Sequence, residues 1–356
     1  MIHTREVMIR ENRIIIALLS VLTVIAVGFV LYQIRSIILP FALAVFISYL
    51  INPVIEFFEK RHMPSVLAII LALIITFLVI NVFGMLIYTS VRSFAAEFPK
   101  YSQRLNMLMF DVLDFLRIPR DALNGEGEFS GGFQLLTSIR ELSLHRVILN
   151  TLGSLLNFMS NSILVLLFLL FIMIGRNQLA RKVQVAFEAQ MAMRIAGMLK
   201  NINKQIQRYL IAKSFTSLAT GLLFYITLRL FDLEFAIIWG LLAFLLNFIP
   251  NIGSVIATIL PLLIAFIQFD NIAIVFWMAL ILSSIQMVIG NFLDPRIVGR
   301  SLNLSPLVVL FSLMFWGWLW GVIGMFLAVP ISVILKIILE NVKSLRFMSV
   351  LMSHSS

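Results

Sequence analysis

The stretch Asn247-Phe248-Ile249-Pro250-Asn251-Ile252-Gly253 interrupts an apolar run that extends from Phe235 to Phe269. A continuous helix of about 35 residues would be about 52 Å long, whereas the hydrocarbon core of a bilayer is roughly 30 Å thick. Proline removes a backbone donor, glycine permits a turn, and the two asparagines can satisfy the freed backbone groups. The sequence therefore predicts two short helices that meet at a break.

A second apolar run, from Leu302 to Leu339, is also too long for a single crossing. Its candidate break is Trp316-Gly317-Trp318-Leu319-Trp320-Gly321, with Gly324 and Pro330 beyond it. The tryptophans are not assigned to a binding site, because Trp is enriched at bilayer interfaces and the trio can serve as an anchor. We interpret each run as a broken hairpin that enters and leaves the membrane on the same side.

The composition around these runs excludes a water-soluble globule. The chain of 356 residues is 61% hydrophobic and 12% charged, against about 45–50% and about 25% in soluble proteins. Continuous apolar stretches of about 20 residues favour helices over a β-barrel, whose strands alternate in polarity. We therefore expect an all-α polytopic membrane protein with about eight transmembrane elements, two of which are broken helical hairpins.

Lys and Arg residues indicate which loops face the cytoplasm. The chain has 27 basic and 17 acidic residues, and we interpret this excess as a topology signal, with no nucleic-acid partner. The strongest cytoplasmic marker is segment 176–213, which carries eight basic residues and one acid, Glu188. Most of the remaining basic residues also lie inside if both long runs are hairpins, which places the N-terminus in the cytoplasm.

These features divide the chain into six segments. We expect N-terminal transmembrane helices 1–3 at 1–91, an extracytoplasmic amphipathic helical segment at 92–151, transmembrane helix 4 at 152–175, a cytoplasmic basic amphipathic helix at 176–213, a transport core with two broken hairpins at 214–340 and a cytoplasmic tail at 341–356. Within the core, a span followed by a broken hairpin occurs twice in opposite orientations. This pattern predicts an inverted repeat, in which transporters place a site near the midplane.

An enzymatic function has no candidate residues in this sequence. The four His residues lie in termini or loops, there is no HExxH, and no charged residue is expected inside a span. The absence of cysteine excludes thiolate metal sites, and we expect no metal and no cofactor. Because no GxxxxGK[ST] loop is present, transport would draw on a gradient or on the solute's own concentration difference.

Polar side chains gather around the two long runs and form the candidate site. The candidate substrate-binding residues are Asn247, Pro250, Asn251, Gly253, Gln286 and Asn291, and the candidate gating or coupling residues are Asp294, Pro295, Arg296 and Gly321. An uncharged polar set of this kind suits a small hydroxylated solute. The alternative is that the amides bridge helices or satisfy backbone groups at kinks, and that Asp294-Pro295-Arg296 only ends a helix.

Several of these motifs, in this order, resemble the AI-2E family, the autoinducer-2 exporter family of permeases. The matching stretches are Asn247 to Gly253 followed by Pro261, Gln286 to Asn291, Asp294 to Gly299, Leu304-Ser305-Pro306, and Gly321 through Gly324 to Ala328-Val329-Pro330, within about Arg208 to Leu339. The resemblance implies a bacterial inner-membrane transporter, usually described as eight-spanning, in a ring-like homo-oligomer such as a pentamer. Some members are associated with export of the signal autoinducer-2, and others with exchange of sodium or lithium against protons.

Three functions remain open at this point. The first is export of a small polar solute, such as an autoinducer-2-like quorum-sensing signal, by alternating access without ATP. The second is a sodium or lithium/proton antiporter, which needs a titratable group at membrane depth; Asp232, Glu234, Asp270 and Asp294 are not expected there. The third is a non-transporting membrane scaffold that binds partners through residues 92–150.

Overall fold

The computed structural model describes residues 18–115, 144–297, 304–342 and 345–353, apart from residues 20, 21, 24 and 177. Within these ranges the chain is almost entirely helical, and one isolated β-bridge joins Leu304 to Ser353. Five of the described helices are long and apolar enough to cross a membrane, and three shorter apolar helices accompany them. The all-α membrane class is thereby confirmed, whereas eight transmembrane elements and an inverted repeat stay predictions.

Parts of the expected organisation lie outside the described residues. They include the basic N-terminal end of the chain, much of the extracytoplasmic segment (116–143) and the stretch 298–303 that follows Ile297. The roles expected for these segments stay predictions.

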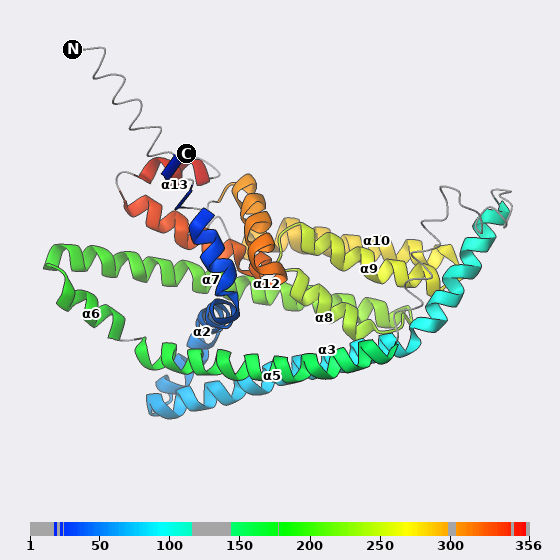
Figure 1. Cartoon of the computed structure of the whole chain (residues 1–356), viewed down its shortest axis with the longest axis horizontal. Helices are drawn as coiled ribbons and strands as arrows, with labels where there is room; N and C mark the ends of the chain where they lie inside the picture. Colours follow the sequence, from blue (N-terminus) through cyan, green and yellow to red (C-terminus); the bar gives the residue numbers. More distant parts are fainter. Residues whose placement is uncertain are drawn as a thin grey trace, which may run out of the picture. The chain divides into compact units, whose positions relative to one another are not determined.

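The helices follow one another along the chain as labelled in Figure 1. They are α2 (Arg35–Lys60), α3 (Ser65–Phe115), α5 (Leu144–Gly175), α6 (Gln178–Ala186), α7 (Ala189–Leu230), α8 (Ala236–Leu246), α9 (Ile252–Gln268), α10 (Ile272–Val288), the π-helix η2 (Ile289–Leu293), α11 (Asp294–Ile297), α12 (Pro306–Asn341) and α13 (Arg346–Met352). Helix α3 extends beyond its apolar part, which ends at Phe94. Helix α7 runs without interruption through residues 213 and 214, where a segment boundary was expected.

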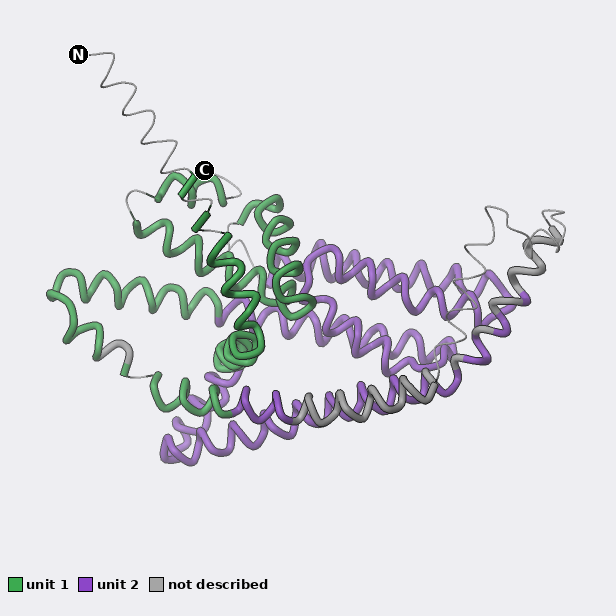
Figure 2. The backbone as a smooth tube through the Cα atoms, viewed as in Figure 1, with its two compact units in different colours: residues 1–49, 167–206, 303–356 green, residues 50–166, 207–302 purple. Residues whose placement is uncertain are grey.

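The chain divides into two compact units, which we describe separately (Figure 2). Unit 1 comprises residues 1–49, 167–206 and 303–356, and therefore contains α12 and α13. Unit 2 comprises residues 50–166 and 207–302, and therefore contains α8, α9, α10 and α11.

In unit 2, the three apolar helices α8, α9 and α10 pack in sequence against one another (Figure 1). Their core contains Phe224 and Leu228 from α7 together with Trp239, Ala265 and Leu282. Helix α7 crosses α8 closely, since a Cβ atom on Gly221 would lie 2.7 Å from the carbonyl oxygen of Gly240. Small residues permit such close backbone contacts between membrane helices.

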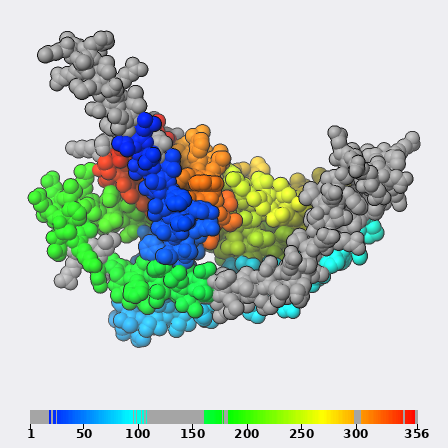
Figure 3. Space-filling view, in the orientation of Figure 1, coloured from blue at the N-terminus to red at the C-terminus, as the bar shows by residue number. Residues whose placement is uncertain are grey.

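One face of α9 is apolar and exposed. Val255, Ile259, Leu263 and Phe266 follow one another at helical spacing and are between 49% and 56% exposed, and Figure 3 shows this segment in yellow at the surface. A continuous apolar face of this kind is unfavourable in water, so it indicates contact with lipid or with another apolar surface.

Candidate functional site

The first long apolar run is broken between Asn247 and Gly253, as predicted from its proline and glycine. Helix α8 ends at Leu246 and α9 begins at Ile252, with Asn251 at φ 60° and ψ −58°. This is the geometry of a γ-turn, in which the Ile252 N–H donates to the Pro250 carbonyl oxygen at 2.7 Å. Gly253 is buried, and a side chain there would overlap the carbonyl oxygen of Leu246. Glycine is therefore required where the two short helices meet.

The second long run, within unit 1, is broken at Gly321. Its φ of 66° and ψ of −146° interrupt α12, and a side chain on Gly324 would overlap the carbonyl oxygen of Trp316. The two arms are joined by Ser312 and Ser332, whose hydroxyl oxygens are 2.7 Å apart. The run therefore folds back on itself, with a glycine against a carbonyl group as in the first break.

Helix α7 carries a buried polar face in unit 2. Thr216, Ser217 and Thr220 are fully buried, whereas Phe215, Leu218 and Leu222 on the same helix are between 54% and 60% exposed. This arrangement reverses that of a helix on a water-soluble protein, and it is expected where lipid surrounds the molecule. The polar face thus lies inside the protein.

The α8–α9 break contacts this polar face through an amide. Asn247, 3% exposed, donates a hydrogen bond from Nδ2 to the hydroxyl oxygen of Ser217 over 3.0 Å. The Thr220 hydroxyl donates to the carbonyl oxygen of Thr216 at 2.9 Å, and each hydroxyl oxygen keeps the capacity to accept a further hydrogen bond.

An ion pair lies one helical turn along α7 from Ser217. The Nζ atom of Lys213 is 2.6 Å from Oδ2 of Asp294, and the side chains are only 8% and 21% exposed. Asp294 begins α11 directly after the π-helix η2, a type of distortion that is frequent at functional sites. Oδ1 of Asp294 and Nε2 of Gln286 are buried without a hydrogen-bond partner among the described residues.

Lys213 was not among the predicted site residues, because it was assigned to a basic cytoplasmic segment. Its ion pair with Asp294 is largely buried, and buried charges in a helical membrane protein are costly and make the pair a candidate functional site. The available signal was the pairing of one lysine with the polar residues that follow it at helical spacing.

The predicted site residues are distributed unevenly. Asn247 and Gly253 are buried at the first break, Pro250 and Gln286 are half-buried, Asp294 is paired with Lys213, and Asn251, Asn291, Pro295 and Arg296 are exposed. Gly321 is exposed at the break in unit 1. Contacts with α7 are therefore made by Asn247 and Asp294, and the functional roles assigned to the whole set stay predictions. No group of His, Asp and Glu suited to a metal ion occurs within the described ranges.

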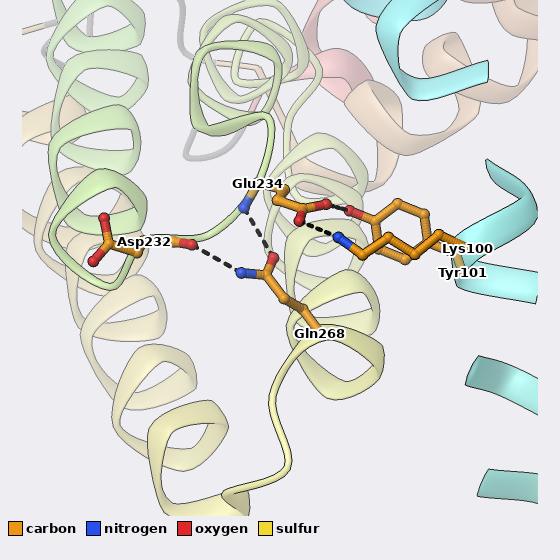
Figure 4. Close-up of polar contacts among 5 residues, drawn as sticks. All are labelled: Lys100, Tyr101, Asp232, Glu234 and Gln268. Atoms are coloured by element: carbon orange, nitrogen blue, oxygen red, sulfur yellow. Dashed lines mark hydrogen bonds and ion pairs between the residues drawn. The ribbon is translucent and has the colours of Figure 1, made fainter. Parts of the chain in front are cut away.

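A second polar cluster surrounds Glu234, in the turn between α7 and α8 (Figure 4). Its carboxylate forms an ion pair with Lys100 at 2.6 Å and accepts a hydrogen bond from the Tyr101 hydroxyl. The Gln268 side chain, at the end of α9, accepts from the Glu234 backbone N–H at 2.9 Å and donates to the Asp232 carbonyl oxygen at 2.8 Å. Glu234 thereby connects the turn to α3 and α9.

The cluster also perturbs the ionisation of its members. Burial raises the pKa of Glu234, but hydrogen bonds from Lys100 and Tyr101 lower that pKa more, so it lies below its ordinary value. Burial and the hydrogen bond to Glu234 raise the pKa of Tyr101. The hydrogen bond to Glu234 likewise raises the pKa of Lys100.

Long apolar helices, two broken runs and a polar face enclosed by apolar surface are features of a multi-pass helical membrane protein, and discontinuous helices of this kind are common in transporters. The family model for AI-2E family transporters matches residues 19–344, and the chain belongs to this family.

Named relatives agree with this assignment. The chain is 35% identical over 345 residues to the AI-2 transport protein TqsA of Escherichia coli, covering 95% of each chain. It is 32% identical over 317 residues to a protein of Borreliella burgdorferi whose name refers to transport and gives no solute, covering 89% of this chain and 84% of the relative. These relatives identify the chain as a membrane transporter of a bacterial family.

Proposed function

We propose that this transporter exports a small polar solute across the bacterial inner membrane by alternating access and without ATP. The buried polar face of α7 carries the proposal, because it offers hydroxyl and amide groups inside an apolar helical unit. The two broken runs supply the flexible elements, since discontinuous helices in transporters combine free backbone groups with bistable geometry. In this scheme the N-terminus lies in the cytoplasm.

The first solute to test is autoinducer-2. The relative from Escherichia coli is named for AI-2 transport, and the uncharged hydroxyl and amide groups of the α7 polar face and Asn247 are compatible with a small hydroxylated molecule. The same scheme includes several copies of the chain in a ring, an expectation that rests on the family resemblance.

Efflux from proteoliposomes tests this function. Purified protein would be reconstituted in liposomes loaded with autoinducer-2, and release would be followed in the absence of ATP. We expect release faster than from protein-free liposomes, and a dependence on the solute gradient. Release at the rate of protein-free liposomes, from protein shown to be folded by its thermal transition, would refute solute export.

A second candidate is a sodium or lithium/proton antiporter, and the ion pair of Lys213 with Asp294 favours it. Such an antiporter needs a carboxylate at membrane depth that exchanges a proton for a cation. One oxygen of Asp294 has no partner in the described part of the chain, so it is available to contribute to a cation site. In this candidate Asp294 supplies that carboxylate, and its burial beside Lys213 supports the assignment.

A pH-sensitive dye inside the same liposomes separates the two candidates. Antiport predicts that an imposed sodium or lithium gradient changes the internal pH, and that Asp294→Asn abolishes the change. Solute export predicts autoinducer-2 release with no pH response to either cation.

A further inference from the structure

A cavity lies beside the Glu234 cluster, away from the α7 polar face. Its lining combines polar side chains with the apolar residues Leu233, Phe235, Ala236, Ile237 and Ile238. The cavity has a volume of about 520 Å³ and lies among α3, the end of α7 and the turn that leads into α8. Thr89, Ser90 and Ser93 line it from α3, and Tyr225 and Arg229 line it from α7. Its volume falls within the range of small-molecule sites.

The wall of this cavity is held in place by the contacts shown in Figure 4. The turn residues Asp232 and Phe235 adopt positive φ angles of 53° and 60°. Aspartate tolerates this conformation, but it is unfavourable for a bulky residue such as Phe235. Gln268 binds both sides of the turn, and the Trp239 indole donates to the Glu234 carbonyl oxygen at 3.2 Å. A wall fixed by hydrogen bonds before a ligand arrives lowers the entropic cost of binding.

The charged groups of the cavity are balanced. Arg229 and Asp232 are 4.0 Å apart, and the Glu234 carboxylate is occupied by Lys100 and Tyr101. The cavity therefore presents hydroxyl and phenol groups beside an apolar wall, and the formal charges of its lining residues and their ion-pair partners cancel. Hydrogen bonds combined with apolar contact favour a neutral ligand that carries several hydroxyl groups.

We propose that this cavity binds a neutral, polyhydroxylated solute of sugar-like size, as a second site on the route of the transported molecule. The inference rests on the proposed function, since it takes the cavity ligand to be the transported class of solute. In the proposed topology the cavity faces the extracytoplasmic side, so it would hold the solute before release.

Protection of a single introduced cysteine tests the cavity directly. The chain contains no cysteine, so Ser93→Cys introduces one thiol at the cavity. The variant would be placed in nanodiscs, where both membrane faces are accessible, and the rate of reaction with a maleimide would be measured with ribose, sodium chloride or inorganic phosphate. We expect ribose to slow the reaction several-fold in a saturable manner, and the two salts to leave it unchanged.

Ile272→Cys is the matched control, because Ile272 begins α10, is 70% exposed and does not line the cavity. Its labelling rate should be the same with and without ribose. A second variant, Glu234→Gln in the Ser93→Cys background, should weaken protection by ribose, because it removes the ion pair that fixes the wall.

Two results would overturn the proposal. Labelling of Ser93→Cys that ribose does not slow refutes a polyol site, and equal protection by phosphate or sodium chloride refutes the neutral class of ligand. Efflux measured in parallel on the wild-type protein keeps the two proposals apart. Efflux without protection rejects the cavity alone, whereas protection without efflux of any tested solute rejects the proposed function.

Discussion

Lys213 and Asp294 form a buried ion pair, with Nζ 2.6 Å from Oδ2, although 81 residues separate them in the sequence. Replacing one partner leaves an uncompensated buried charge, which typically costs about 3–5 kcal/mol. Lys213→Met and Asp294→Leu should each lower the Tm of the purified protein strongly, and the double variant should recover most of the loss. Equal Tm values for the single variants and the wild type would show that the pair does not stabilise the fold.

Gly253 should tolerate no side chain. In Gly253→Ala the new methyl group overlaps the carbonyl oxygen of Leu246, a backbone atom that cannot move without shifting the α8–α9 break. We expect the free energy of unfolding to fall by about 1–3 kcal/mol, the usual cost of overpacking a buried site. Gly290→Ala is the control, because a Cβ atom there has open space around it. Thermal unfolding of both variants measures the difference, and the Tm of Gly253→Ala should be the lower one. A similar Tm for both variants would contradict the close contact.

The breaks in the two long apolar runs could be predicted from the length and composition of those runs. The run around Asn247 to Gly253 was too long for one helix, so a break was required, and proline and glycine located it. The same argument applied to Gly321. Backbone interruptions of this kind are local, and their signals are present in neighbouring residues.

Contacts between distant segments could not be predicted in the same way. The partner of Asp294 lies on α7, in a helix that continues from a basic segment, and periodicity alone does not reveal that Lys213 is buried in the folded protein. The attachment of Glu234 to Lys100 and Tyr101 also depends on α3 continuing beyond its apolar part. Both contacts arise from tertiary packing, which the periodicity and propensities of a single sequence do not predict.

The stability contributed by the Glu234 cluster should depend on pH. The pKa of Glu234 is lowered in the folded protein, so its contribution is present above its ordinary value near 4.5 and is lost as the pH falls through the lowered value. The pKa values of Tyr101 and Lys100 are raised in the folded protein, so their contribution to stability is present at lower pH. That contribution is lost as the pH rises beyond about 10.

A pH series of thermal transitions checks this prediction. Below pH 4.5 the Tm of the wild type should fall further than the Tm of Glu234→Gln, because the glutamine cannot ionise at this position. Parallel Tm curves for both proteins across this acidic range would contradict the assigned ionisation.

The most direct test of the account is solute efflux through a protein whose α7 hydroxyls have been removed without a change of shape. Thr216→Val with Thr220→Val makes the buried face apolar, and Thr76→Val is the matched control, because Thr76 is buried and donates to the carbonyl oxygen of Ala72. If the polar face lines the route of the solute, autoinducer-2 efflux through the double variant should be about tenfold slower than through the wild type. This decrease corresponds to about 1.4 kcal/mol in the barrier to transport. The control should keep the wild-type rate. Wild-type efflux from a folded double variant would contradict the account.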